Sequence, residues 1–524
     1  MSKVSKKKNV KSLLASVIGS DNLLFIQIIE ERSLKLYKYW DVSTVKKLLD
    51  SLLPFKDQLK AVFLNASKIR TSEYSSSYES SKAIKDFLLR HSIPFHFFSV
   101  TFTFSLNVLV AANFNPSIKD YVVFLNVGEN DLIYKLYQFT SKGYEFVMTM
   151  ENKENDLEKF TKSLSELMKV FTVKKLILFT LVKDNNIFFK KTEAHLKTSK
   201  LLFIKDKLIV VDYKKLIETE VSGRSIAEMG KWLFDRSYVR FNIVPFIEQT
   251  FKIFGIIGDS RKGHIFVQQG KETPFKEFIV VEKSVQQVTM MQYEEKMHEV
   301  LETLKLDHNC HRRKIILLFE SECFPEIKIE SIIIPEIKEL PKKLNGICDM
   351  KIPVIGFFDS SAVICVYKND GYKFLNSWNG LYGNGLFINF EESKAEYGME
   401  SIKADKTKMS SVVYNLIKIM SMPSEKFVEK EEWKYVITKN SENPVLIEFV
   451  NHEGRKQAGT PSFLMAMLLK EILKRIKNEL NEEKPKEIGL CFFDKMFEDE
   501  KKRVENGLKE ACELLKVGCK FIDV

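Results

Sequence analysis

Residues 460–492, TPSFLMAMLLKEILKRIKNELNEEKPKEIGLCF, contain a helix pattern followed by a strand pattern. Thr460 is placed to cap the helix and Pro461 to occupy its first turn. The short apolar run Ile488–Phe492 is typical of a buried strand. A helix followed by a buried strand favours an α/β fold. The apolar residues that recur every three or four positions, as on one helix face, are Met465, Leu468, Leu469, Ile472, Leu473, Ile476 and Leu480.

The same alternation of strand and helix patterns covers most of the remaining chain. A helical stripe of apolar residues runs over Val45–Leu53. The stretch from Phe241 to Ile334 differs, because it has many short strand patterns and few helical windows apart from Tyr293–Leu304. We therefore expect α/β lobes and a separate β-rich module. The runs that predict strands are Tyr121–Leu125, Leu176–Thr180, Leu208–Val211, Ile265–Val267, Phe278–Val281, Ile315–Phe319 and Ile332–Ile334.

The length and composition restrict the class of protein. A chain of 524 residues exceeds what one hydrophobic core organises, so roughly two to four domains are expected. An apolar fraction of 45% and a charged fraction of 29% exclude disorder for the bulk of the chain. The net charge of +11 is spread along the length, and lysines cluster only at Lys3, Lys6, Lys7, Lys8 and Lys11. We therefore expect no specific nucleic-acid partner.

Cysteine usage and the apolar stretches predict the compartment. The 7 cysteines are odd in number and lack close paired spacing, and no signal-type apolar stretch follows the basic amino terminus. We therefore expect a cytoplasmic or nuclear location. Residues 93–118 carry no formal charge and could span a bilayer by length. Polar residues alternate with apolar ones from Phe98 to Val108, which is a strand signal and favours a buried strand or helix over a membrane span.

An internal repeat relates the two ends of the chain. Residues 20–100 and residues 433–524 each present a strand-like run, a helix, a strand, a polar helix and a final apolar run. The strand-like runs that open the two copies are Leu23–Ile29 and Val445–Val450. We therefore expect two related lobes, one at each end.

Several segments resemble one known family in the same order along the chain. Val354–Gly371 (VIGFFDSSAVICVYKNDG) is similar to an opening phosphate-loop hairpin. Tyr121–Tyr134 (YVVFLNVGENDLIY) lies where that family has a second phosphate loop, D-L-G-G-G-T-F-D. Val288–Glu295 (VTMMQYEE) is similar to a strand that reads V-T-I-Q-V-Y-E-G-E. The chain thus resembles the seventy-kilodalton heat-shock chaperones, which join an actin-like nucleotide-binding domain to a β-sandwich substrate domain.

The resemblance implies four segments. They are a basic tail at 1–19, a degenerate actin-like nucleotide-domain segment at 20–240, a β-sandwich substrate-binding-like domain at 241–345, and a second-copy opening lobe at 350–524. The first copy then lacks its opening hairpin, and the second copy supplies one. These complementary truncations leave open a composite nucleotide domain built from both copies.

The same resemblance identifies a nucleotide site that has lost most of its groups. Asp359, Ser360 and Ser361 remain in the first phosphate hairpin, without the glycine that lets backbone N–H groups approach a phosphate. Gly128 remains in the second loop, where Glu129 stands at a glycine position and would repel a triphosphate. We read these positions as vestiges of a nucleotide site.

The catalytic groups that the family uses are missing as well. The lysine position falls on Ile417, with Lys418 one residue away on a different helix face. We therefore expect no cofactor, no metal and no hydrolysis. ATP and Mg²⁺ enter only under the alternative in which binding and hydrolysis are retained.

The resemblance assigns peptide binding to the β-rich module. In the family this domain holds an extended apolar peptide by main-chain hydrogen bonds and a side-chain pocket. The candidate positions are Val267, Phe278, Val280, Val288 and Met290, and sandwich alternation favours a core role for each. The degraded loops favour a protein that holds or scaffolds unfolded or partner polypeptides, with co-chaperones as further implied partners. An ATP-dependent folding chaperone and one part of a longer tandem product remain alternatives.

Overall fold

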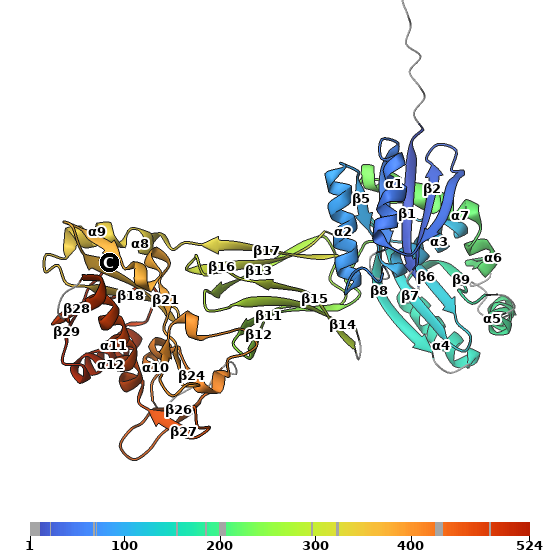
Figure 1. Cartoon of the computed structure of the whole chain (residues 1–524). Helices are drawn as coiled ribbons and strands as arrows, with labels where there is room; N and C mark the ends of the chain where they lie inside the picture. Colours follow the sequence, from blue (N-terminus) through green and yellow to red (C-terminus); the bar gives the residue numbers. More distant parts are fainter. Residues whose placement is uncertain are drawn as a thin grey trace, which may run out of the picture. The chain divides into compact units, whose positions relative to one another are not determined.

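A computed structural model describes residues 11–20, 23–65, 69, 71–152, 156–183, 186–198, 206–294, 297–320, 324–424, 433–480 and 484–524. The chain is mixed α/β, as predicted, and divides into two compact units (Figure 1). The first unit comprises Met1–Glu248, Gln268–Phe275 and Leu318–Glu326, and the second comprises Gln249–Val267, Lys276–Leu317 and Ile327–Val524. No helix among the described residues combines the length and the apolar character needed to cross a membrane.

The first unit begins with a five-stranded sheet in the order β3-β2-β1-β4-β5. The first three strands pair antiparallel, whereas β4 and β5 run parallel to β1. Because β1 begins at Leu13, part of the predicted basic tail is strand. The elements are β1 (Leu13–Ser20), β2 (Leu23–Glu30), β3 (Leu36–Val42), α1 (Val45–Leu52), β4 (Leu59–Asn65), α2 (Ser77–Arg90) and β5 (Phe95–Phe97).

A second five-stranded sheet in this unit has the order β10-β9-β6-β7-β8. Here too three strands are antiparallel, and β9 and β10 continue the sheet in parallel. Its elements are β6 (Tyr121–Val127), β7 (Leu132–Thr140), β8 (Gly143–Asn152), α4 (Leu157–Val170), β9 (Val173–Phe179), α5 (Ile187–Thr198), β10 (Leu208–Val211) and α6 (Tyr213–Leu216).

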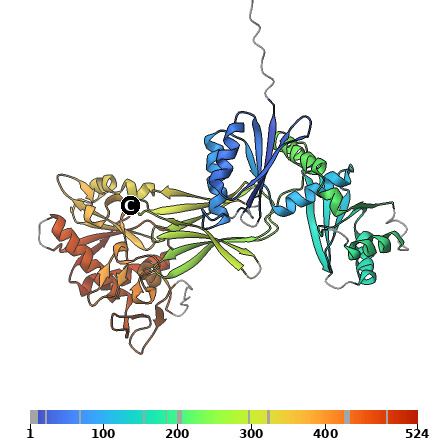
Figure 2. The same ribbon diagram turned by 45° about the vertical axis from the view of Figure 1, so that its right-hand side comes forward.

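The uncharged stretch at 93–118 contains a largely buried helix over Val100–Ala112, so the expectation of a buried strand or helix is confirmed. The strand pattern read from Phe98 to Val108 is wrong, because most of these residues are helical. Helix α3 (Val100–Ala112) begins where the Ser99 hydroxyl accepts the Phe102 N–H at 3.0 Å, and it ends at Asn113 with a φ of 47°. It shares one apolar cluster with both sheets and with α7 (Thr219–Phe234). Figure 2 shows α3 and α7 between the two sheets of this unit. A helix that packs on several sides loses the apolar–polar period by which helices are recognised.

The second unit contains a third sheet, in the order β20-β19-β18-β28-β29. Strands β18 to β20 are antiparallel, and β28 and β29 continue in parallel. All three sheets therefore share one strand order, and β1–β2 corresponds to the hairpin β18–β19. The prediction that the first copy lacks its opening hairpin is thus wrong, and the complementary truncations disappear. The run Val445–Val450 belongs to a separate small sheet and is not the counterpart of β2.

The part of the second unit that contains the third sheet, residues 335–524, is here named the third lobe. Two helices pack in its main core. Helix α11 (Pro461–Leu480) begins as predicted, because the Phe463 N–H donates to Thr460 Oγ1 at 3.2 Å. Helix α12 (Glu498–Leu514) belongs to the same cluster. The other elements are α8 (Pro335–Lys338), α9 (Leu340–Ile347), β18 (Val354–Phe358), β19 (Ser361–Tyr367), β20 (Tyr372–Phe374), β21 (Asn384–Gly385), β22 (Ile388–Asn389), β23 (Glu396–Tyr397), β24 (Val412–Val413), α10 (Leu416–Ser421), β25 (Val436–Thr438), β26 (Leu446–Val450), β27 (Lys456–Gly459), β28 (Glu487–Phe492) and β29 (Gly518–Phe521).

Residues 250–332 form the predicted β-rich region, here named the strand module. It has two sheets, β12-β11-β14-β15 and β13-β16-β17. The helical window Tyr293–Leu304 is wrong, because its described residues, 293–294 and 297–304, lie in the antiparallel pair β14–β15. The strands are β11 (Thr250–Ile257), β12 (Ser260–Val267), β13 (Phe275–Glu282), β14 (Gln287–Glu294), β15 (Met297–Lys305), β16 (Arg312–Phe319) and β17 (Pro325–Ile332).

Candidate functional site

Two carboxylates lie at the carboxyl ends of neighbouring parallel strands in the third sheet. Asp359 follows β18 in the two-residue turn to β19 and has a φ of 46°. Asp494 lies just beyond β28, which runs parallel to β18. In open α/β sheets, ligand sites lie outside the carboxyl ends of the strands. The fold therefore makes this edge the candidate site of the second unit.

The guanidinium group of Arg312, at the start of β16, binds both carboxylates. Its Nε donates to Asp359 Oδ2 at 2.8 Å and its Nη2 to Asp359 Oδ1 at 3.0 Å. The same Nη2 also donates to Asp494 Oδ1, and the Asp359 backbone N–H donates to Asp494 Oδ2. Bidentate guanidinium–carboxylate pairs are among the strong ion pairs of proteins. A single positive charge of the strand module is thus shared by the two acids.

The remaining residues of this turn are engaged as well. The Ser360 hydroxyl donates to Glu282 Oε2 at 2.7 Å, and Ser361 is buried opposite Phe358 in the strand ladder. Burial raises the pKa of Asp359 to about 6, against the lowering effect of the Arg312 hydrogen bonds. The hydrogen bonds that Arg312 donates to Asp359 in turn raise the pKa of Arg312 above its ordinary value. The turn is therefore held by charges and hydroxyls of the chain itself.

A cavity of about 280 Å³ lies beside these carboxylates. Ile417 and Lys418 both line it, so Lys418 reaches the cavity although it lies one residue from the predicted lysine position. Three lysines and four carboxylates share the wall, and with the Arg312 guanidinium on two of these carboxylates the formal charges balance (4 − 4 = 0). The wall therefore has no excess positive charge to attract a triphosphate. The lining residues are Lys262, Glu282, Asp359, Asn415, Ile417, Lys418, Ser421, Asp494, Lys495, Met496 and Glu500.

The strand module is joined to the third lobe by further buried polar contacts. Lys283 is 1% exposed and donates from Nζ to the carbonyl oxygens of Tyr382 and Gly383, at 2.8 and 2.7 Å. Burial lowers the pKa of Lys283 to about 8. His311 accepts the Ile334 N–H at Nδ1 (2.8 Å), and its Nε2 lies 2.8 Å from the Leu381 carbonyl oxygen. His311 is therefore a buried structural contact.

Gly128, the other position that the resemblance assigns to a nucleotide site, lies in the turn between β6 and β7 of the first unit. Its N–H donates to the Asp131 carbonyl at 2.9 Å, and its own carbonyl accepts from Asn186 Nδ2 at 2.9 Å. A Cβ on Gly128 would lie 1.8 Å from Asp131 Oδ1. The Asp131 carboxylate therefore packs on the bare face of the glycine, where a phosphate would need room. Gly128 and Asp359 belong to different compact units.

The residues at the carboxyl-end site do not fit ATP with Mg²⁺. Asp359 and Asp494, two of the four carboxylates at the cavity, share the guanidinium of Arg312. The two-residue turn lacks glycine, and its first N–H is used by a carboxylate. Within the described part of the chain, no group of three or more His, Cys, Asp or Glu residues could hold a metal ion.

The predicted peptide-binding residues separate into two groups. Val267, Val288 and Met290 are at most 1% exposed and are core residues. Phe278 and Val280 are 60% and 45% exposed on β13, and Lys314 Nζ lies 4.5 Å above the Phe278 ring. The latter two can therefore contact another molecule.

A second cavity, of about 240 Å³, lies beside β13 and includes Val280 in its lining. His264 also lines it as the extra residue of a bulge in β12, because Ile253 pairs with Ile265 and Phe254 with Gly263. Bulges re-aim side chains. The bare Cα of Gly255 admits this imidazole, since a Cβ there would lie 2.5 Å from His264 Nε2.

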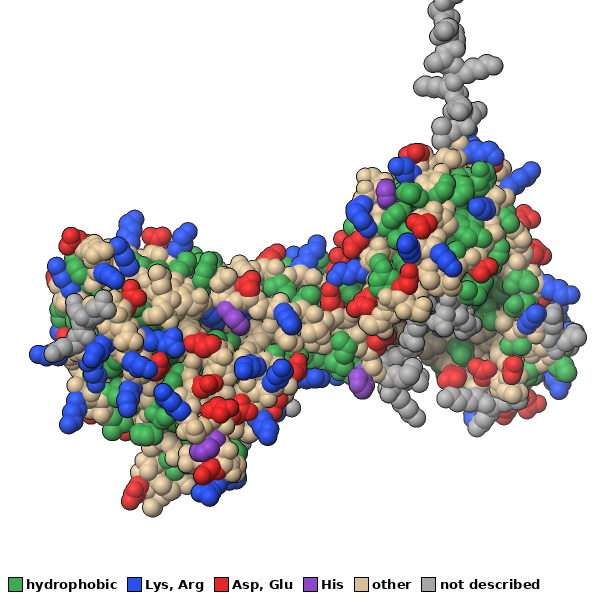
Figure 3. Space-filling model, viewed as in Figure 1, with side chains coloured by type: hydrophobic (Ala, Val, Ile, Leu, Met, Phe, Trp, Pro, Cys, Tyr) green, Lys and Arg blue, Asp and Glu red, His purple; other side chains and the backbone are tan. Residues whose placement is uncertain are grey.

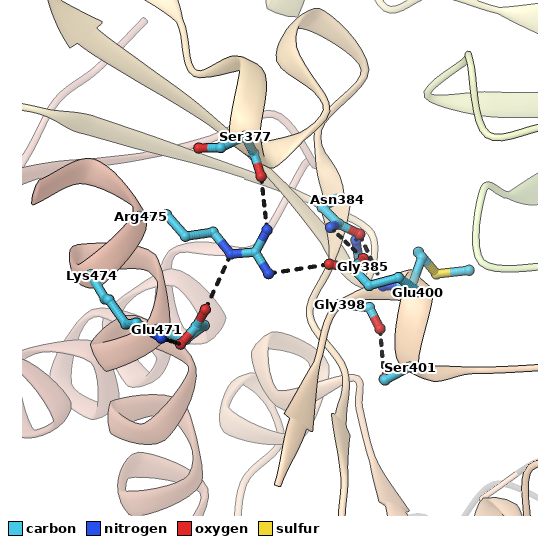
Figure 4. A network of polar contacts seen from close by, with 10 residues as sticks. Ser377, Asn384, Gly385, Gly398, Glu400, Ser401, Glu471, Lys474 and Arg475 are labelled. Atoms are coloured by element: carbon cyan, nitrogen blue, oxygen red, sulfur yellow. Dashed lines mark hydrogen bonds and ion pairs between the residues drawn. The ribbon is translucent and has the colours of Figure 1, made fainter. Parts of the chain in front are cut away.

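A separate polar network fixes the loops of the third lobe against α11 (Figure 4). Arg475 donates from Nε to Glu471 (3.2 Å), from Nη2 to Glu400 (3.2 Å) and from Nη1 to the Ser377 carbonyl (2.8 Å). The Asn384 amide donates to the other Glu400 oxygen at 2.8 Å. We assign a structural role to this network, because each of its polar groups binds another residue of the chain.

The surface carries charges of both signs. On the face shown in Figure 3, Lys and Arg side chains are interspersed with Asp and Glu. A nucleic-acid binder concentrates its positive charge in a patch or stripe. The view is thus consistent with the expectation of no specific nucleic-acid partner, which stays a prediction.

Three residues that matter at the site were missed from sequence. Asp494 follows a predicted strand directly, and the rule for carboxyl ends of parallel strands would have found it. Arg312 and Glu282 carry no comparable signal, because only the packing of the module brings them to Asp359. No protein-family model matches the chain, and no match was found among curated proteins.

Proposed function

We propose that this protein is a heat-shock-chaperone-like protein that holds or scaffolds polypeptides without nucleotide turnover, in the cytoplasm or nucleus. The observation that carries the proposal is the Arg312 guanidinium bound to both Asp359 and Asp494. Because the guanidinium already binds both carboxylates, they are not free to bind a metal ion. Without a nucleotide that binds two states differently, no cycle of affinity can be driven.

The architecture supports a resemblance to actin-like lobes and a β-sandwich. Three sheets share the order of three antiparallel strands followed by two parallel strands. The strand module adds two sheets, of four and three strands. This is the combination that the sequence resemblance implies, with a third lobe at the carboxy-terminal end.

The exposed face of β13 supports polypeptide binding. Phe278 and Val280 alternate with less exposed neighbours, and β13 is the edge strand of its sheet. An extended peptide can add to a sheet edge by main-chain hydrogen bonds, with apolar side chains giving further contact. This mode of recognition needs no catalytic residue.

A binding experiment tests the proposal. A fluorescently labelled, reduced unfolded polypeptide is titrated with the full chain and with Phe278→Asp. We expect the variant to weaken binding by about tenfold, since one buried aromatic contact contributes on the order of 1–2 kcal/mol. Phe463→Asp, at a residue that is 52% exposed on α11, is the matched control and should bind as the parent does. Equal binding by both variants, or none by the parent, contradicts the proposal.

One observation favours the alternative of an ATP-dependent folding chaperone. Lys418 lines the same cavity as Asp359 and Asp494, so a lysine and two acids do converge. A lysine near a transferring phosphoryl group is one part of such catalysis. Mg²⁺-dependent phosphate release by the full chain that is abolished by Lys418→Met would establish this alternative.

A further inference from the structure

Strand β3 forms an exposed edge of the first sheet. Every residue from Leu36 to Tyr39 is exposed, with Leu36 at 45%, Tyr37 at 41% and Tyr39 at 58%. The equivalent strand of the third lobe, β20, is three residues long, and its Tyr372 is 4% exposed. The two lobes share a strand order, but their edge strands differ, because β3 is exposed whereas Tyr372 of β20 is buried.

The outer edge of β3 is available for pairing with another strand. Among the described strands, β3 pairs only with β2. An edge strand presents a row of N–H and C=O groups that can pair with another strand. Short length or a cover protects many natural edges. In the third lobe the Tyr372 hydroxyl donates to the Ile352 carbonyl and also contacts Cys348 Sγ. β3 instead carries aromatic side chains outward.

The sequence of β3, LYKYWDV, is complementary to itself in antiparallel pairing. With Tyr39 on a two-fold axis, Lys38 faces Trp40 of the second copy, and Tyr37 faces Asp41. No like charges then lie opposite each other, whereas an axis at Lys38 or Asp41 would oppose two identical charges. Lys38 Nζ already lies 4.7 Å above the Trp40 ring within one chain, so the cation–π pairing is suited to both strands.

We propose that β3 is the interface of a homodimer in which two copies pair antiparallel through Tyr39. The two five-stranded sheets then form one continuous sheet. The two-fold axis makes the contact isologous, so each copy offers the same patch. This inference does not depend on the proposed polypeptide-holding function.

Charge substitution at Tyr39 tests the interface in the full chain. Tyr39→Glu and Tyr39→Lys each place two like charges on the axis, and we expect each to weaken dimerisation by at least about tenfold in sedimentation equilibrium. A mixture of the two variants should restore a heterodimer. Tyr74→Glu, at a residue that is 36% exposed and lies outside β3, is the matched control. A monomeric parent, a dimer that survives both substitutions, or a mixture that does not associate overturns the proposal.

Cysteine crosslinking tests the register. Residues opposite each other in an antiparallel pair have Cα atoms about 4.5–5.5 Å apart, within disulfide reach. Tyr39→Cys should therefore form a covalent dimer on mild oxidation, whereas Asp41→Cys should not, because residue 41 faces Tyr37. Folding of each variant is checked by its melting temperature against the parent. Crosslinking at position 41 but not at 39 overturns the register.

Discussion

Arg312 donates to both carboxylate oxygens of Asp359, from Nε at 2.8 Å and from Nη2 at 3.0 Å. The pair joins a strand of the strand module to the hairpin that the sequence resemblance identifies as a phosphate loop. A side chain at that place stabilises the junction, because it pairs the buried carboxylate with a cation of the chain itself.

Removal of the guanidinium should loosen the β18–β19 hairpin. We expect Arg312→Ala to lower the free energy of opening by about 2 kcal/mol, because two acids lose their shared cation. Hydrogen exchange of residues 354–367 measures it. Arg261→Ala is the control, since its ion pair with Asp405 is 3.8 Å long and more than half exposed on both sides, and it should cost under about 0.5 kcal/mol. Equal effects of the two substitutions would refute this role of Arg312.

The pKa of Asp359 gives a pH dependence of definite sign. Burial raises it from 3.8 to about 6, so between these values the folded chain binds more protons than the unfolded chain. The stability that Asp359 contributes is therefore greatest below pH 3.8 and is lost as pH rises through about 6. The parent should gain roughly 2–3 kcal/mol relative to Asp359→Asn on acidification across this window. Parallel pH profiles for the two proteins would contradict the raised pKa.

Loss of the Arg475 side chain should lower the stability of the third lobe far more than loss of the neighbouring Lys474 side chain. We expect Arg475→Met to destabilise the third lobe by about 1–2 kcal/mol, because it removes hydrogen bonds to two carboxylates and a carbonyl. Lys474→Met is the matched control, with a side chain that is 63% exposed and one contact to Glu471 at 3.6 Å. It should change stability by less than about 0.5 kcal/mol. Urea unfolding followed by tryptophan fluorescence gives the comparison, to which Trp378 contributes with its ring under the Arg475 guanidinium.

Gly128 should tolerate no side chain while Asp131 is present. Gly128→Ala forces the Asp131 carboxylate away, and we expect it to cost about 1 kcal/mol in the β6–β7 turn. The double variant Gly128→Ala/Asp131→Ala should recover part of this loss, as hydrogen exchange of residues 121–140 can measure. Gly346→Ala, where a Cβ meets nothing within 4 Å, is the control and should be neutral or stabilising. No recovery in the double variant would show that Asp131 is not the obstacle.

The sequence predicted those parts of the fold that local patterns specify. The α11 helix with its Thr460 cap and the strand β28 follow directly from spacing and capping, and the mixed α/β class follows from their alternation. Helix α3 was not predictable in this way, because it packs against two sheets and α7 and has no polar face. The hairpin β1–β2 was missed because the run before Leu23 was assigned to the basic tail.

At the candidate site, only the residues of the hairpin turn itself were predictable from the sequence. Asp359 and Ser360 could be located in the hairpin turn from the sequence. Their partners Arg312 and Glu282 lie 47 and 78 residues away in the chain, and no spacing rule links them. Lys418 reaches the same cavity as Ile417, because α10 has only six residues and presents neighbouring side chains to one cavity.

The release rate of a bound, labelled unfolded polypeptide from the full chain, with and without Mg²⁺-ATP, tests the central claim most directly. We predict measurable binding and the same release rate in both conditions, with no phosphate liberated. Faster release on addition of ATP, together with liberated phosphate, would contradict a chaperone-like protein that works without a nucleotide cycle.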